Sequence, residues 1–309
     1  MNTEMSSDVK FVRPAGLKAG DTVGICAPAR KVSGDDLRQA VQVVESWGLR
    51  VRLSENLFAG CSMLAGSDEQ RAADVQALID APDVSAILFA RGGYGCARLL
   101  QKLDFSGLKK APKWLAGYSD ITVFHLALYR LGVESLHAAM PFKFTDAASV
   151  DSLRAALFGQ DVSRELAPHE LNVKGTATGR LTGGNLSIIY SLQATPCELL
   201  SDGAVLFVED VDEYLYHVDR MMLNLALSGR LGKLKALLVG GMTEMKDSVG
   251  GYGKSAYEII SEHARPLNIP VAFGFPAGHQ DPNVALCMGR EVQLEVSDKR
   301  ALLRYSEQA

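Results

Sequence analysis

Hydrophobic residues in the first half of the chain alternate between short continuous runs and helically spaced stripes. The run at 23–27 predicts a buried strand, whereas the apolar positions after Ser33 recur every three or four residues and predict a helix. In order along the chain, strands are predicted at 23–27, 49–53, 85–90 and 113–117, and helices at 37–47, 67–79, 99–103 and 121–131. This β-α-β-α order predicts an α/β fold on a parallel, doubly wound sheet, with functional loops at the carboxyl ends of the strands.

Capping and breaking residues mark the ends of two of these helices. Ser67 and Gln70 have the spacing of a capping box at the start of the second helix, and Pro82 must stop it. Gly48 closes the first helix.

The alternation breaks between about residues 147 and 174, where polar residues and Pro168 interrupt any strand pattern. We therefore predict two domains, residues 1–150 and 175–309, joined by a linker at 151–174. The second half is predicted to contain a loop at 182–185, strands at 204–208, 236–239 and 291–296, and helices around Met221 and Ile259. The smaller C-terminal domain is thus predicted to be α/β or α+β.

The composition of the 309 residues is that of an ordinary globular protein, with 47% hydrophobic and 22% charged residues. A net charge of −4 and the lack of a Lys/Arg run argue against a nucleic-acid partner. The sequence has no run of about 18 apolar residues and no signal-peptide core in its first 21 residues, so we expect no membrane partner and a soluble cytoplasmic protein.

Five cysteines are spread along the chain in neither a CxxC nor a Cys/His cluster: Cys26, Cys61, Cys96, Cys197 and Cys287. We interpret them as reduced thiols that mostly fill the core. No spacing of His, Cys and carboxylate residues forms a recognisable metal site, and no cofactor is predicted.

The most specific local feature is Ser119, which lies where a predicted buried strand turns into a helix. A serine in such a turn projects its hydroxyl above the sheet, as a nucleophile elbow requires. Ile121 stands where the usual G-x-S-x-G pattern has its last glycine, and a helix-capping serine would look identical in sequence. Nucleophile and N-cap are therefore both open interpretations of Ser119.

A catalytic serine needs a base, generally a histidine that a carboxylate orients. Of the six histidines, His279 lies in a Gly/Pro-rich loop after a predicted strand, the usual place for a catalytic side chain. A histidine on a surface loop would have the same sequence context. His137 follows another strand-like run and could approach the loops of the first domain.

Glu209 is the preferred carboxylate, because it ends an apolar strand and so lies at the rim where loops converge. Its rivals are Asp210, Asp212 and Glu213. These three belong to the start of the next helix, where acidic residues favour the helix dipole without any catalytic role.

A Gly-rich loop, Arg91 to Gly95, follows the predicted strand at 85–90. It lacks the Walker lysine and the G-x-G-x-x-G spacing, so the sequence gives little support to a nucleotide loop. Glycines let backbone N–H groups approach a ligand, and Gly93 together with the N–H of Asp120 would suit an oxyanion hole. A tight turn explains the glycines equally well.

Five motifs in this order resemble the LD-carboxypeptidase family of serine peptidases over nearly the whole chain. They are Arg91-Gly-Gly-Tyr-Gly95, Gly117-Tyr-Ser-Asp120, Gly183-Gly-Asn185, Leu206-Phe-Val-Glu-Asp210, and Gly278-His279 with Asn283. The resemblance implies a Rossmann-like N-terminal domain that carries the nucleophile and a C-terminal domain that carries a glutamate and a histidine. By motif, it assigns the catalytic triad to Ser119, Glu209 and His279.

The resemblance also implies a reaction. Peptidases of this family cut the bond between an L-centred meso-diaminopimelate and a C-terminal D-alanine in cytoplasmic murein tetrapeptides during cell-wall recycling, and they commonly act as homodimers. An exopeptidase must bind the free carboxylate, for which a guanidinium is the best-shaped partner. Arg91 and Arg180 are the candidates, with Gly92 and Asn185 as further substrate-binding residues.

Two departures from the family pattern lie beside the predicted site. Cys287 stands where proline is expected, and residues 136–140 read Leu-His-Ala-Ala-Met in place of the usual His-Gly-Pro-Met. These changes concern substrate detail more than the triad.

Two alternative functions stay open at the level of sequence. One is a microcin-immunity-type hydrolase of peptidyl or aminoacyl nucleotides, which would need an aromatic platform that the sequence does not identify. The other is a non-catalytic muropeptide-binding module.

Overall fold

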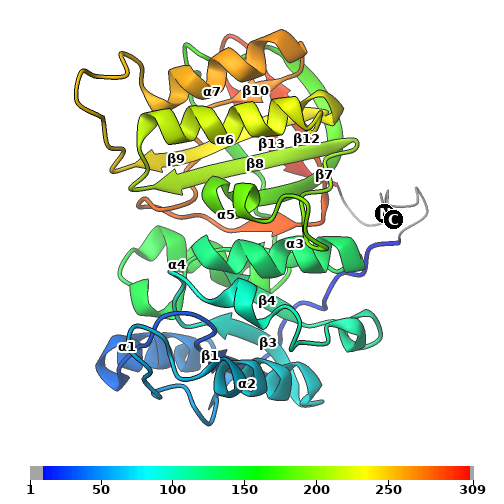
Figure 1. The fold of residues 1–309 in the computed structure, drawn as a ribbon. Coiled ribbons are helices and arrows are strands. Elements are labelled where there is room, and N and C mark those ends of the chain that lie inside the picture. The colour runs from blue at the N-terminus through cyan, green and yellow to red at the C-terminus, as the bar shows by residue number, and fades with distance from the viewer. Residues whose placement is uncertain (1–9, 307–309) are drawn as a thin grey trace.

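The computed structural model describes residues 10–306, which form two stacked α/β layers, each with its own sheet (Figure 1). The first sheet contains β1 (Thr22–Cys26), β2 (Arg50–Leu53), β3 (Val84–Phe89), β4 (Trp114–Gly117), β5 (Ser135–His137) and β11 (Leu286–Met288). Its order is β11-β5-β4-β3-β1-β2, and every neighbouring pair except β11 and β5 is parallel. The predicted parallel sheet is thus confirmed. Its antiparallel edge strand β11, which the pattern does not predict, comes from the second half of the chain.

The helices of the first half are α1 (Gly34–Ser46), α2 (Asp68–Asp80), α3 (Thr122–Leu131) and α4 (Ala147–Leu157). The capping box of Ser67 and Gln70 at the start of α2 is confirmed, and Ser33 forms a second one at the start of α1. Short 3-10 helices occur at Cys96–Leu99, Ser106–Lys109, Ser119–Ile121, Pro141–Lys143, Leu231–Lys233 and Arg265–Leu267.

The helix predicted at 99–103 is wrong, because this stretch forms only a single 3-10 turn at Cys96–Leu99. The backbone N–H of Cys96 donates to the Asp120 carboxylate at 2.8 Å, and that of Asp104 donates to Gln76 Oε1 at 2.9 Å. These hydrogen bonds to distant residues hold the backbone on both sides of the stretch, and the leucine spacing alone does not reveal them.

The second sheet contains β6 (Arg164–Leu166), β7 (Gly175–Asn185), β8 (Ala204–Val211), β9 (Ala236–Thr243), β10 (Val271–Ala272), β12 (Glu291–Val296) and β13 (Ala301–Tyr305). Its order is β10-β9-β8-β7-β12-β13-β6, in which β7 to β10 are parallel and the other pairs antiparallel. Helices α5 (Leu186–Ser191), α6 (Leu215–Leu227) and α7 (Ala256–Ala264) complete this layer, with α6 and α7 covering one face of its sheet (Figure 1). The predicted α/β or α+β character of this half is confirmed.

The loop predicted at 182–185 is the end of strand β7. The glycines were interpreted as loop residues, but in the structure they allow β7 to pack closely against its neighbour β8. A Cβ on Gly183 would lie 2.0 Å from the carbonyl oxygen of Phe207 on the neighbouring strand β8. Only glycine fits there, and the chain continues as a strand because β8 pairs with it residue by residue.

The segment predicted as a linker, 151–174, contains most of α4 and all of β6. Val150 and Leu153 of α4 are buried in the core cluster that the first sheet also uses. The expectation that regular structure stops near residue 147 is therefore wrong. The domain boundary itself stays a prediction.

Helix α3 lies between the two layers and joins them (Figure 1). Phe124 and Leu128 of α3 share one core cluster with Leu186 of α5 and Leu206 of β8. The loops that follow β3 and β4 therefore face loops of the second half across a closely packed junction.

The strand order of the first sheet reverses its direction of growth at β1 and β3. In doubly wound sheets, the crevice outside the carboxyl ends of the two strands at such a reversal is the usual ligand-binding place. The residues that follow β1 and β3 therefore lie where a ligand-binding site is expected.

All five cysteines are free thiols, as expected. Cys26, Cys96 and Cys287 are buried, and Cys197 is half-buried. Cys61 is exposed, so three of the five cysteines are buried. Over residues 10–306, no helix combines the length and the apolar character that crossing a membrane requires.

Candidate active site

Ser119 follows β4 at the tight turn into α3 and has a φ of +65°, a left-handed value that is strained for a residue with a Cβ. Tyr118 precedes the 3-10 turn and Ile121 precedes α3, and neither end receives a side-chain cap. The N-cap interpretation of Ser119 therefore has no support in the structure. A strained serine between a parallel strand and a helix is the backbone geometry of a nucleophile elbow.

Ser119 and His279 line the same cavity, which has a volume of about 410 Å³. Its lining residues are Arg30, Arg91, Gly92, Gly93, Tyr118, Ser119, Met140, Phe142, Lys143, Val211, Asp212 and His279. They come from the loops after β1, β3, β4, β5 and β8 and from the loop between β10 and β11. The two halves of the chain build this cavity together.

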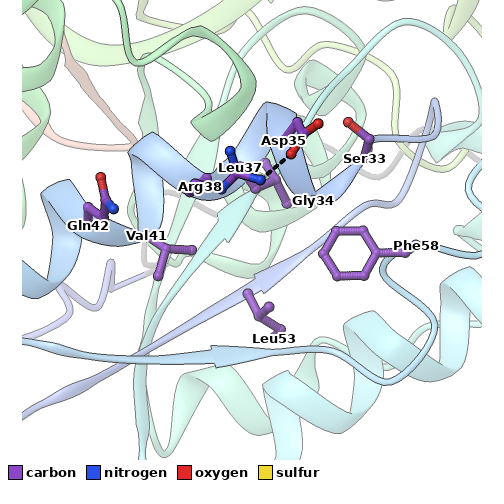
Figure 2. Close-up of a pocket in the computed structure, with 9 residues that line it drawn as sticks. All are labelled: Ser33, Gly34, Asp35, Leu37, Arg38, Val41, Gln42, Leu53 and Phe58. Atoms are coloured by element: carbon purple, nitrogen blue, oxygen red, sulfur yellow. Dashed lines mark hydrogen bonds and ion pairs between the residues drawn. The ribbon is translucent and has the colours of Figure 1, made fainter.

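A larger hollow of about 560 Å³ lies elsewhere, along α1 and β2 (Figure 2). Phe58, Leu53 and Val41 give it an apolar wall, while Asp35 and Arg38 form an ion pair on the helix above (Figure 2). It shares no lining residue with the cavity at Ser119 and contains no histidine. Size alone therefore does not identify the reactive site.

His279 is held by Glu209, which lies 70 residues earlier in the chain. His279 Nδ1 lies 2.7 Å from Glu209 Oε2, and the backbone N–H of His279 donates to the same oxygen at 3.1 Å. Glu209 is fully buried. A Cβ on Gly278 would lie 2.7 Å from Glu209 Oε2, so the glycine before the histidine lets the carboxylate approach.

Burial and Glu209 act in opposite directions on the pKa of His279. Burial lowers it, but the attraction of the Glu209 carboxylate and the hydrogen bond that His279 donates to it raise the pKa, with Asp210 adding to the rise and Lys143 opposing it. The balance leaves the pKa above its ordinary value of 6.5.

The rival carboxylates have other partners. Asp210 accepts hydrogen bonds from Asn185 Nδ2 at 2.9 Å and from the Ser187 hydroxyl at 2.7 Å, and burial, reinforced by the neighbouring Glu209, raises its pKa to about 6. Asp212 forms an ion pair with Lys246. None of these contacts orients His279.

A third rival, Glu213, accepts from Ser187 and pairs with His217. It is therefore bound to a histidine that does not line the cavity. Glu209 remains the carboxylate that the geometry favours.

The other five histidines lie outside the cavity lining. His217 pairs with Glu213, His263 with Asp219, and His169 packs against Phe273 and Tyr257; His125 and His137 are buried in the first half. Burial lowers the pKa of His125 to about 4 and that of His137 well below 6.5. His137 was predicted to approach the loops of the first domain, but it lies in the core instead. Its ring packs edge-on against Phe207 with a centroid distance of 5.0 Å.

The glycine loop after β3 contacts the nucleophile. A Cβ on Gly92 would lie 3.3 Å from Ser119 Oγ, so this glycine allows the loop to touch the serine. Gly93 lines the cavity, and the Asp120 carboxylate fixes the loop through Cys96 N. Burial raises the pKa of Asp120. The role of the Gly93 and Asp120 N–H groups as an oxyanion hole stays a prediction.

The structure separates the predicted substrate-binding residues into two groups. Arg91 and Gly92 line the cavity, whereas Arg180 and Asn185 do not. Arg180 lies over the ring of Phe11 at 4.3 Å and donates to the carbonyl oxygen of Gly289 at 3.1 Å. Asn185 begins α5 as its N-cap and holds Asp210.

Two cations at the cavity escaped the sequence reasoning, Arg30 after β1 and Lys143 after β5. The signal that could have found them is their position, because both follow parallel strands at the carboxyl edge of the sheet. Neither belongs to a recognisable motif.

Ser119 thus lines the same cavity as the imidazole of His279, which the buried Glu209 carboxylate holds. These are the residue types that proton transfer from a serine hydroxyl to an imidazole requires. Among the described residues, no cluster of three or more His, Cys, Asp or Glu side chains could hold a metal ion.

Comparisons with known proteins agree on one family. Residues 23–138 match the LD-carboxypeptidase N-terminal domain, and residues 178–294 match the LD-carboxypeptidase C-terminal domain. A probable murein peptide carboxypeptidase of Bacillus subtilis (strain 168) is 33% identical over 299 residues, which cover 94% of each chain. The crystal structure of muramoyltetrapeptide carboxypeptidase from Oxalobacter formigenes superposes with a TM-score of 0.84 at 32% identity, covering 93% of this chain and 99% of that one.

A more distant relative is related to the alternative function of a microcin-immunity-type hydrolase. The microcin C7 self-immunity protein MccF of Escherichia coli is 24% identical over 324 residues, covering 92% of this chain and 93% of its own. At this identity the similarity indicates a shared fold.

Proposed function

Because this chain belongs to the LD-carboxypeptidase family and is a serine-type carboxypeptidase, we propose that it releases the C-terminal D-alanine from murein tetrapeptides. The bond to be cut joins the L-centre of meso-diaminopimelate to D-alanine, in cytoplasmic peptides that arise during cell-wall recycling. The observation that carries the proposal is the contact of His279 Nδ1 with the buried Glu209, beside the strained Ser119.

The proposed mechanism follows from which ring nitrogen the carboxylate occupies. With Nδ1–H bonded to Glu209, Nε2 of His279 keeps its lone pair and can accept the proton of Ser119. Ser119 Oγ then attacks the carbonyl carbon, and the imidazolium returns the proton to the nitrogen of the departing D-alanine. His279 Nε2 then takes a proton from a water molecule, whose oxygen attacks the acyl-enzyme carbonyl, and the imidazolium returns that proton to Ser119 Oγ as the acyl group leaves.

The oxyanion of the tetrahedral intermediate needs donors that are already in place. In our proposal these are the backbone N–H groups of Gly93, in the loop after β3, and of Asp120, the residue that follows Ser119. Gly92 supports the assignment, because its close approach brings the loop against the serine.

The direct test is to incubate the purified protein with L-Ala-γ-D-Glu-meso-diaminopimelate-D-Ala and to follow the products by mass spectrometry. We expect one product that lacks one alanine. Intact peptide after long incubation with a folded protein would falsify the carboxypeptidase proposal and leave a non-catalytic muropeptide-binding module as the better description.

Chirality gives a second prediction. The same peptide with a terminal L-alanine should be cut about a hundredfold more slowly or not at all, because inverting the stereocentre displaces the scissile carbonyl, and a shift near 1 Å can cost that factor. The comparison requires only kcat/KM for the two diastereomers. Equal rates would contradict a site shaped for the LD bond.

Metal independence gives a third prediction. Since the proposed nucleophile is a serine hydroxyl, treatment with a chelator followed by dialysis should leave kcat unchanged. The measurement is the rate of D-alanine release before and after treatment. A loss that zinc restores would refute the serine mechanism.

We do not propose an aminoacyl nucleotide as the substrate, because the cavity offers no clear binding surface for its base. Recognition of a base requires a free aromatic face. The aromatic rings that line the cavity are Phe142, which Arg91 covers at 5.1 Å, and Tyr118, which is 3% exposed and packs against His279. Neither offers such a face, so the tetrapeptide is the better candidate.

We further propose, from the family resemblance alone, that the protein acts as a homodimer. Size-exclusion chromatography with light scattering tests this point without substrate. A mass equal to one chain at assay concentration would contradict it.

A further inference from the structure

We propose that Arg30 is the specificity-determining residue that binds the free carboxylate of the residue to be released, a role that rests on the carboxypeptidase function proposed above. Arg30 follows β1, and the glycine loop follows the neighbouring strand β3, so the two meet at the crevice where the sheet reverses direction. Arg30 lines the same cavity as Ser119 and His279.

Short distances through the glycine loop connect Arg30 to the serine. A Cβ on Gly92 would lie 3.3 Å from Ser119 Oγ, and a Cβ on Gly93 would lie 2.6 Å from Arg30 Cδ and 2.8 Å from Arg30 Nε. Gly93 also has a φ of +112°, so glycine is required both by the backbone and by the arginine that crosses it. The backbone N–H of Arg30 donates to the carbonyl oxygen of Gly92 at 3.3 Å, which fixes the base of the side chain to this loop.

One glycine therefore faces the nucleophile and the next faces the arginine. This step of one residue matches the substrate, in which the terminal carboxylate lies one residue beyond the scissile carbonyl, a span of about 3.8 Å between consecutive Cα atoms. With the carbonyl carbon at Ser119 beside Gly92, the carboxylate falls beside Gly93, where the stem of Arg30 crosses the loop.

The charges of the cavity favour an anion at this point. Its charged lining residues are Arg30, Arg91, Lys143 and Asp212, and Asp212 is already paired with Lys246 at 2.6 Å. Over residues 10–306, no carboxylate forms an ion pair with the three cations of the lining. The cavity thus has an excess of positive charge that a carboxylate would neutralise.

Arg30 fits the carboxylate better than its two cationic neighbours. Arg91 stacks on the ring of Phe142, and Lys143 offers a point charge rather than a planar fork. The guanidinium of Arg30 has neither an ion pair nor a stacked ring within the described chain, so both edges of its fork can donate to two carboxylate oxygens.

The experiment compares the murein tetrapeptide with its C-terminal amide in four proteins: wild type, Arg30→Gln, Arg91→Gln and Arg180→Gln. Wild type should prefer the acid by about a hundredfold in kcat/KM, because a site built for a carboxylate rejects a neutral analogue. Arg30→Gln should lose this preference, because its KM for the acid should rise far more than its KM for the amide. Arg180→Gln, a matched change outside the cavity, should keep the preference.

Arg30→Lys separates recognition from folding. It keeps the charge without the fork and should restore part of the preference, whereas a purely structural arginine would give parallel losses on acid and amide. The inference is overturned if Arg30→Gln still prefers the acid over the amide as strongly as wild type does. It is also overturned if Arg30→Gln and Arg30→Lys both lose activity on acid and amide in parallel, or if Arg91→Gln, and not Arg30→Gln, removes the preference. Failure of the proposed function looks different, since wild type itself would then release neither D-alanine from the acid nor D-alaninamide from the amide.

Discussion

Replacing Ser119 by alanine should lower kcat by about 10⁴-fold or more, because the residual catalysis of a triad enzyme without its nucleophile comes only from oxyanion stabilisation and binding. The loss should appear in kcat and kcat/KM alike, since the hydroxyl forms its bond only along the reaction path. D-alanine release measured by mass spectrometry over hours has the range to detect such a residual rate.

The fold should survive this change. Ser119 caps no helix, so its hydroxyl contributes little to the free energy of unfolding. The matched control is Ser33→Ala, which removes the cap of α1 and should cost about 1 kcal/mol of stability while leaving kcat unchanged. If Ser119→Ala turns over like the parent, or if Ser33→Ala loses as much activity, Ser119 is not the nucleophile.

Replacing Glu209 by glutamine should lower kcat by about 10⁴-fold, the scale observed when the orienting carboxylate of a triad becomes an amide. The amide can no longer stabilise the imidazolium, and it can hold the histidine in the wrong tautomer. Glu213→Gln is the matched control, because Glu213 is an acidic side chain on the same segment that binds Ser187 and His217 instead. Equal losses in the two variants would refute the assignment of Glu209.

The same variant predicts a change in pH dependence. In the folded protein the pKa of His279 is raised, with burial opposing the rise and Glu209 as the main favourable contribution. The neutral imidazole is the base, so activity of the parent should increase as the pH rises through this raised pKa. Glu209→Gln removes the attraction, and the acidic limb should move to lower pH. Imidazole titration by NMR checks the direction, and an upward shift would contradict it.

The sequence by itself determined most of the local structure of the first half and led to the proposal of the reactive groups. The alternation of apolar runs and helical stripes predicted the β-α-β-α order of the first half, and the capping box at Ser67 predicted the start of α2, since both patterns are local in sequence. Ser119, Glu209 and His279 could be proposed from motif order because each lies at or after the end of a predicted strand, although β8 in fact continues past Glu209 to Val211. Parallel strands place such residues at one edge of a sheet.

Only the tertiary structure decided which of these residues meet. The contact between Glu209 and His279 spans 70 residues, and β11 crosses from the second half into the first sheet beside β5. The order of the strands in the two sheets determines both of these contacts. This order produces no local pattern of apolar residues, so the sequence does not reveal it. The same holds for the glycines of 182–185, which look like a loop until β8 pairs with them.

Arg180 and Arg30 show most clearly that the position of a side chain cannot be predicted from its sequence motif. Arg180 has the motif context of a ligand-binding residue, yet Phe11, far away in sequence, holds it outside the cavity. Arg30 has no motif, yet its side chain lies against Gly93 and lines the same cavity as Ser119. A side chain's direction depends on the atoms that pack against it, and these come from strands that only the folded sheets bring together.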